Sequence, residues 1–159
     1  MKVRCYSPAE LPTDLRARWI DLLDGDPELS SPYFRPEFTE VVGRARADTF
    51  VAVVDDGAAF LPFHREAYNA GVGRPIGAFL SDYQGVISAP GFEFDAAALV
   101  RGAGLSAWAF NHVPASQRAF GRWAETRSES AQVEIAKWER GAPQLTEENR
   151  KRRKLAPLC

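Results

Sequence analysis

Three polar residues that can bind a ligand, Asp82, Tyr83 and Gln84, stand between two apolar segments of the chain. Leu80 precedes them and a valine-isoleucine pair follows soon after, and both segments are typical of strands. Residues 81–85 are therefore predicted to break a sheet at a place where side chains and backbone meet a ligand. The alternative is an irregular turn with solvated tips, because most loops carry no function.

Two histidines offer acid-base chemistry. His64 and His112 could each act as a general base, but no carboxylate stands at metal-ligand spacing from either of them, so no metal site is predicted. A histidine at such a place is more often a hydrogen-bonded strand residue. His112 is the better candidate for touching a substrate, because it shares one face of a predicted strand with Trp108 and Phe110, and that strand leads into a loop.

Other catalytic and cofactor patterns fail on the residues present. The segment 104–108 lacks the last glycine of a serine-hydrolase nucleophile elbow. The glycine-containing segment 71–77 lacks the lysine and hydroxyl pair of a P-loop. Cys5 and Cys159 stand without the spacing of a redox motif or a zinc site, which fits a reducing compartment and leaves neither with an assigned role.

Size and composition favour one ordinary soluble domain. The chain has 159 residues, 45% of them hydrophobic and 26% charged, which is near the average for globular proteins. No run reaches the ~20 apolar residues of a membrane-spanning helix, and the first residues lack the apolar region of a secretory signal. A cytoplasmic location without a membrane span is expected.

The charge is unevenly distributed along the chain. The net charge is −1, and the run 150–154 contributes five positive charges, so the first 149 residues carry −6, from −1 minus 5. A nucleic-acid-binding domain spreads its lysines and arginines over a face, so no nucleic-acid partner is expected. The basic run is interpreted as a solvated helix or tail, with a phosphate-binding or targeting patch as the alternative.

The order of elements predicts a mixed α/β fold. Helices are predicted at 12–24, from residue 36, at 94–102 and at 115–125; strands are predicted at 2–6, 49–54, 58–65, 72–76, 84–88, 105–113 and 131–138.

Several of these elements carry more specific expectations. The first helix turns one stripe to the core, with members Leu11, Leu15, Trp19, Leu22 and Leu23; the second does so with Phe38, Val41, Val42 and Ala45; the fourth packs Phe120 and Trp123. The turn 55–57 predicts a hairpin between the second and third strands. Pro62 cannot donate to a ladder, so the third strand should be bulged or lie at an edge there. Helices interleaved with a hairpin indicate a mixed sheet.

Several of these segments together resemble the FemAB-related branch of the GNAT superfamily, especially CelD-type cellulose biosynthesis proteins. The resemblance covers most of the chain and rests on Trp19 and on the segments 31–38, 60–65, 77–85 and 110–114, of which Leu-Ser-Asp-Tyr-Gln-Gly at 80–85 is the most specific. It implies a GNAT-like, mostly antiparallel sheet flanked by helices, forming one lobe of a two-lobed family. The lobe would span 1–140, and 141–159 would be a basic linker helix or tail that is truncated.

The resemblance also implies an acyltransferase, in which an acceptor amine attacks the carbonyl of an acyl-CoA thioester. In this family a turn with the pattern Arg/Gln-x-x-Gly-x-Gly/Ala holds the pyrophosphate of coenzyme A at a helix N-terminus. The nearest segment here, 74–79, ends in Phe79 and carries a proline. No cofactor site is therefore predicted in this chain, and acyl-CoA is expected only as the family's co-substrate.

The function predicted from these observations is that of an acceptor-binding first lobe. The expected partners are a small-molecule or polysaccharide-related acceptor and a second GNAT lobe. No catalytic residue is assigned, and the substrate-binding candidates are Asp82, Tyr83, Gln84, His112 and Arg65. An enzyme active as written and an unrelated, non-catalytic α/β interaction domain are the alternatives.

Overall fold

The computed structural model describes residues 1–66 and 71–127 of the chain. Residues Met1–Ala124 form a compact unit, and Glu125–Cys159 belong to a second one. The predicted strand at 131–138 and the basic run at 150–154 lie outside the described residues.

The described residues form a mixed α/β fold, as predicted. The α-helices are α1 (Thr13–Asp24), α2 (Pro36–Ala45) and α3 (Ala96–Gly102), and the strands are β1 (Val3–Tyr6), β2 (Thr49–Val54), β3 (Ala59–Arg65), β4 (Val72–Pro75), β5 (Ile87–Ser88) and β6 (Ala107–Trp108). Short 3₁₀ turns connect them, of which η4 (Ala78–Leu80) and η5 (Arg118–Trp123) matter below.

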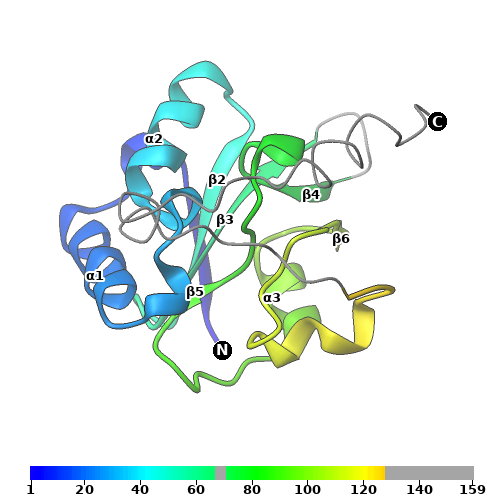
Figure 1. The fold of residues 1–159 in the computed structure, drawn as a ribbon. Coiled ribbons are helices and arrows are strands. Elements are labelled where there is room, and N and C mark those ends of the chain that lie inside the picture. The colour runs from blue at the N-terminus through cyan, green and yellow to red at the C-terminus, as the bar shows by residue number, and fades with distance from the viewer. Residues whose placement is uncertain (67–70, 128–159) are drawn as a thin grey trace, which may run out of the picture. The chain divides into compact units, whose positions relative to one another are not determined.

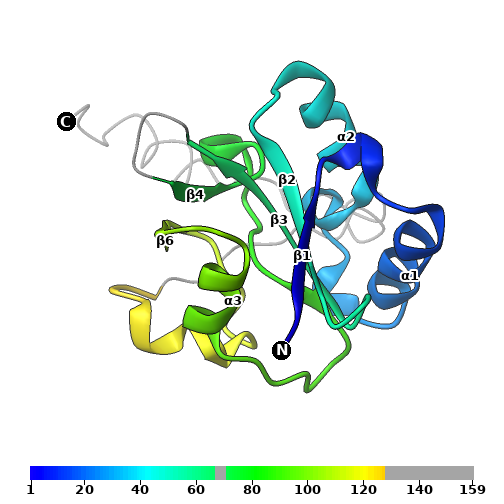
Figure 2. The same ribbon diagram turned by 180° about the vertical axis from the view of Figure 1, so that it is seen from behind.

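The strands form one mostly antiparallel sheet in the order β1-β2-β3-β4-β6, with β5 also paired to β3. Only β4 and β6 run parallel to each other. In Figures 1 and 2, α1 and α2 lie on one side of the sheet and α3 lies on the other.

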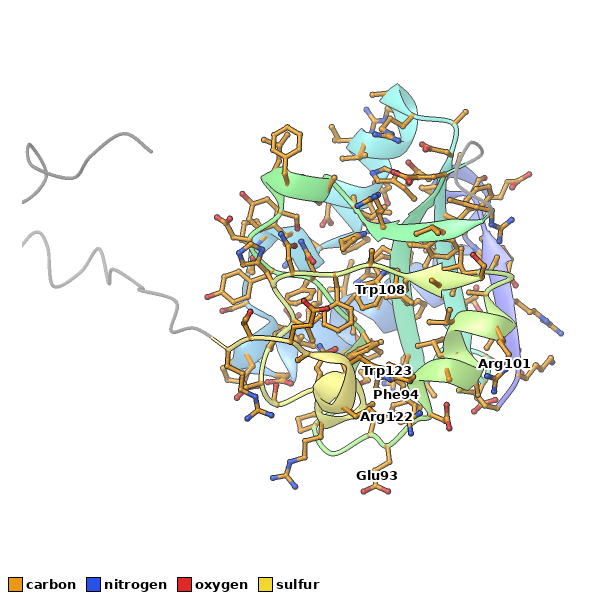
Figure 3. All side chains as sticks on the ribbon, turned by 90° about the vertical axis from the view of Figure 1, so that its right-hand side faces the viewer. Glu93, Phe94, Arg101, Trp108, Arg122 and Trp123 are labelled. Atoms are coloured by element: carbon orange, nitrogen blue, oxygen red, sulfur yellow. The ribbon has the colours of Figure 1, made fainter. Side chains whose placement is uncertain are left out.

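Each face of the sheet buries its own apolar cluster, because successive strand residues point to opposite sides. Val51, Val53 and Phe60 pack against Trp19 and its neighbours in α1. Ala52 and Val54 point the other way, into a cluster with Leu99 of α3 and the aromatic rings of the later segments. Figure 3 shows this second face, with Phe94 and Trp108 labelled.

Helix α1 confirms the apolar stripe expected of it. Trp19, Leu22 and Leu23 are buried, and Leu11 and Leu15 pack against the same cluster. The Trp19 ring stacks on Phe60 with ring centres 5.2 Å apart. Its Nε1–H donates to the carbonyl of Phe34 at 2.9 Å, so the buried indole is also satisfied as a donor.

The expectation for α2 was partly wrong. Its buried residues are Pro36 and Thr39, whereas Val41 is 58% exposed. A side chain at Gly43 would press on Pro8 at 2.8 Å. The helix is therefore closely packed where Gly43 meets Pro8, whereas Val41 faces solvent and Phe38 and Val42 are half-buried.

The later segments are less regular than predicted. The strand expected at 105–113 is limited to β6. Further along, the N–H groups of Asn111 and His112 donate to the side chain of Gln84 and not to the backbone of a strand. The helix expected at 115–125 is the 3₁₀ turn η5, which buries Phe120 but leaves Trp123 exposed. Likewise, β5 covers only the end of the strand predicted at 84–88.

Candidate functional site

Residues 76–86 interrupt what would otherwise be one strand beside β3. Strand β4 pairs with residues 63–65 of β3, and β5 pairs with residues 59–60. On this side of β3, Leu61 and Pro62 therefore have no strand partner; on the other side they pair with β2. The chain leaves the sheet after β4, forms η4 and a loop, and returns as β5. We call residues 76–86 the excursion, and it contains the predicted site.

Pro62 fits this interruption. The N–H of Arg65 donates to the carbonyl of Asp48 at 2.8 Å, so it faces the β2 side of β3. Because N–H directions alternate along a strand, the nitrogen of Pro62 faces the opposite side, where the excursion leaves the sheet. No donor is left without a partner there, since proline has no N–H. β3 is an inner strand of the sheet, but at Pro62 it lacks a neighbouring strand on the β4 and β5 side, so the edge expected at this position is present on that side.

Gln84 holds the excursion to the segment after β6. Its side chain is 3% exposed. Its Oε1 accepts the backbone N–H groups of Asn111 at 3.0 Å and His112 at 3.3 Å. Its Nε2 donates to the carbonyl of Ser81 at 3.0 Å and to Oδ1 of Asn111 at 2.6 Å. With both ends of the amide engaged, Gln84 positions the loop rather than contacting a ligand.

A second glutamine, Gln117, completes this arrangement. Its Oε1 accepts the N–H of Val86 and its Nε2 donates to the carbonyl of Val86, both at 2.9 Å. Gly85 has φ of 141°, and a Cβ there would lie 2.5 Å from Gln117 Oε1. Glycine is thus required where the second glutamine crosses the loop. Gln117 was not among the predicted site residues, because no motif around it indicates the contact.

His64 fixes the start of the excursion. It is buried, and its Nε2 accepts the N–H of Gly77 at 3.3 Å. Nδ1 therefore carries the proton and lies 3.2 Å from Oγ1 of Thr49. Burial lowers the pKa of His64, and the nearby Arg46 lowers it further. With both nitrogens occupied, His64 is a structural residue and not an accessible base.

The groups left accessible are Asp82 and His112. Both are exposed, and they stand on two segments that are joined by hydrogen bonds, including that from the N–H of Gln84 to the carbonyl of His112 at 3.0 Å. Tyr83, which follows Asp82 in the chain, is half-buried, and the centre of its ring lies 6.3 Å from that of Phe34. Four of the five predicted residues thus lie on two bonded segments: three are in the excursion, and His112 is in the segment after β6.

Arg65, the fifth predicted residue, makes its described contacts elsewhere. Its Nη2 donates to the carbonyl of Ala103, just after α3, at 2.7 Å, and its guanidinium lies 4.8 Å from the ring centre of Phe50. The Sγ of Cys5 lies 3.6 Å from the same carbonyl of Ala103. Partial burial raises the pKa of the Cys5 thiol, and the positive charge of Arg65 opposes this rise. A cation at this carbonyl stabilises the end of a helix.

The excursion also presents apolar side chains to solvent. Phe79 is 85% exposed and Leu80 is 63% exposed. The turn that carries them begins at Gly77 with φ of 77°, followed by Ala78 with φ of 48°, a conformation that an alanine rarely adopts. The backbone therefore holds this exposed pair in a strained turn.

A surface hollow of about 290 Å³ lies elsewhere, against β1 and α1. Lys2 and Arg4 line it and each contact Asp56 at 3.5 Å, and all three side chains are more than half exposed. Such ion pairs are largely screened by water. None of the predicted site residues lines this hollow, so we place the candidate site at the excursion.

Comparison of the chain with protein-family models, curated proteins and solved structures gave no match. In the described part of the chain, no helix is long and apolar enough to cross a membrane. Residues 1–66 and 71–127 also bring together no cluster of metal-ligating side chains.

Proposed function

We propose that this chain is the acceptor-binding lobe of an acyl-CoA N-acyltransferase of the GNAT and FemAB-like type, and that it has no acyl-CoA site of its own. The observation that carries the proposal is the pair of exposed groups, Asp82 and His112, on segments that Gln84 joins from within. A rigid, buried support beneath exposed polar groups is the arrangement a binding site needs.

The chemistry suits an amine acceptor. A free amine in neutral water is mostly a cation, and the carboxylate of Asp82 would attract it. Before it attacks, the amine must lose a proton, and an imidazole such as His112 can accept one. The amine nitrogen would then bond to the thioester carbon and the carbon-sulfur bond would break. The departing thiolate of coenzyme A would take up the second proton that the nitrogen loses as it becomes an amide.

The geometry of residues 74–80 supports the absence of an acyl-CoA site. Arg74 and Pro75 belong to β4, and Gly77 is followed by a 3₁₀ turn of three residues instead of a helix. The N–H of Gly77 already donates to His64. Few backbone donors remain for a pyrophosphate, which such sites bind through the free N–H groups of a helix N-terminus.

Two titrations test the proposal. In ¹⁵N-¹H correlation spectra, glucosamine and de-acetylated chitooligosaccharides should shift the amides of 81–85 and 111–113, whereas glucose should not. In a thermal-shift titration, acetyl-CoA at millimolar concentration should leave the unfolding midpoint unchanged, because only a ligand of the folded state raises it. A rise with acetyl-CoA concentration, or amine-induced shifts elsewhere, would contradict the proposal.

A second candidate is a non-catalytic interaction domain, which the exposure of Phe79 and Leu80 favours. Exposed apolar side chains on a rigid turn are typical of contact points between proteins. Under this alternative, Phe79→Ser would remove an association seen by analytical ultracentrifugation, Asp82→Ala would leave it unchanged, and no amine would bind.

A further inference from the structure

His64 stands where a single proton would change the hydrogen bonding of the excursion. Its Nε2 carries a lone pair that accepts the Gly77 N–H at 3.3 Å. Its Nδ1 lies 3.2 Å from Oγ1 of Thr49 in β2. His64 is 2% exposed, so Nε2 can take a proton only when the turn opens; once protonated, Nε2 is a donor that would face another donor. The bond to Gly77 cannot then re-form, because neither group can accept.

The segment held by this bond is strained. Gly77 and Ala78 both have positive φ, and Leu80 and Ser81 donate back to the carbonyls of Gly77 and Ala78 at 2.9 and 3.3 Å. Strained turns persist only while their surroundings hold them. The hydrogen bond from Gly77 to His64 is one such contact.

Several charged groups face His64, and they act in opposite directions. From the segment before β2, Arg46 disfavours the charged imidazolium and Asp48 favours it; Glu66, after β3, also favours it. Asp48 Oδ1 lies 3.6 Å from Nδ1, but its carboxylate is engaged by Arg46 through two bonds of 3.0 and 2.6 Å.

The remaining charge near His64 is on β4. Arg74 is the cross-strand neighbour of His64, and its Nε donates to Glu66 at 2.6 Å. The two carboxylates that could stabilise an imidazolium are thus each neutralised by an arginine.

We propose that His64 is a proton-operated latch on the turn 77–80. While neutral, it holds the turn and the exposed pair Phe79 and Leu80 in the conformation described; when protonated, it releases them. The latch is independent of the proposed function, since it concerns only the conformation of the turn.

Hydrogen exchange of the intact chain tests the latch, after correction for the intrinsic pH dependence of exchange. The reporters are the amides of Gly77, Leu80 and Ser81. As the pH falls below about 6.5, the ordinary pKa of histidine, their opening constant should rise about tenfold per pH unit, because opening is then linked to uptake of one proton. Amides of the β2-β3 hairpin should keep their protection to lower pH. Reporter protection that does not change with pH would overturn the proposal.

Three variants make the test specific. His64→Gln keeps an acceptor for Gly77 and cannot titrate, so its reporter protection should not vary with pH. Arg46→Gln should move the midpoint of release to higher pH, and Asp48→Asn should move it to lower pH. The latter two keep His64 in place, so the test stands even where His64→Gln does not fold. Unchanged midpoints in both, or a His64→Gln profile that matches the wild type, would each refute the latch.

Discussion

The excursion lies beside the β2-β3 hairpin, yet the two regions are held by different kinds of contact. In the hairpin, the backbones of two strands satisfy each other along six residue pairs, and side chains contribute packing on both faces. In the excursion, the side chains of Gln84, Gln117 and His64 take the place of a partner strand. An apolar side chain of the hairpin can therefore be replaced by one of similar volume, whereas a side chain that binds backbone, including His64 of β3, cannot.

The largest loss of stability should come from a change to the packed side chains of the hairpin. Phe60→Ala removes a fully buried ring that stacks on Trp19, and should lower the free energy of unfolding by about 4 kcal/mol. Phe60→Leu should cost less than about 1.5 kcal/mol, since volume is nearly kept. Urea denaturation measures both, and similar losses for the two variants would show that volume is not what matters in the hairpin.

In the excursion, a change that keeps volume should still be costly. Gln84→Leu fills the same space but leaves the N–H groups of Asn111 and His112 and the carbonyl of Ser81 without their partner. We expect a loss of about 3 kcal/mol, because each buried unsatisfied group costs about 1–3 kcal/mol. Asp82→Asn, on the exposed neighbour, is the control and should change urea stability by less than about 0.5 kcal/mol. A loss below 1 kcal/mol for Gln84→Leu would mean that the side chain does not hold the loop.

The crossing of Gln117 over Gly85 can be tested by a matched pair of glycine variants. Gly85→Ala adds both backbone strain and a clash with Gln117, and we expect it to cost about 2 kcal/mol. Gly91→Ala adds strain alone, because nothing lies within 4 Å of its Cβ position, and should cost about 1 kcal/mol. Thermal unfolding should also show that Gly85→Ala costs less in a Gln117→Ala background. Equal costs in both backgrounds would argue against the contact.

The free energy of unfolding should depend on the protonation of His64 in a pH range separate from that of the carboxylates. Its pKa is lowered in the folded state by burial and by Arg46, so the unfolded chain binds the proton more readily. Stability is then complete above about pH 6.5 and falls as the pH drops below it, by up to about 1.4 kcal/mol per pH unit. Asp48, whose pKa is lowered by Arg46, loses its contribution only at more acid pH. Urea titrations between pH 7 and 5 should show this slope in the wild type and not in His64→Gln; equal slopes would assign it to other groups.

The same comparison explains what could be predicted from the sequence. The hairpin followed from a β-branched run and the turn residues Asp55 and Asp56, both at positive φ, because these are local signals. The apolar stripe of α1 followed from its period. The break in the sheet at 81–85 was also predicted, since apolar segments bracket it.

The bonds that hold the break were not predictable, because they join residues far apart in the chain. Gln84 and Asn111 are 27 positions apart, and Val86 and Gln117 are 31 apart. Gln84 stands in the predicted site, but no pattern around it indicates its partners, and no motif surrounds Gln117. Arg65 was expected at the site because it belongs to the segment 60–65 on which the family resemblance rests, and only the fold shows that it contacts Ala103 instead.

We propose that the excursion separates support from binding: Gln84 holds the loop and Asp82 contacts the acceptor. The most direct measurement is the affinity for de-acetylated chitooligosaccharide, by NMR titration, of the wild type, Asp82→Ala and a control, Asp21→Asn, at an exposed carboxylate of α1. We expect Asp82→Ala to lose binding at least about tenfold, equivalent to 1.4 kcal/mol, while its unfolding free energy changes by less than about 0.5 kcal/mol. Binding that persists in Asp82→Ala, or falls equally in Asp21→Asn, would contradict the claim.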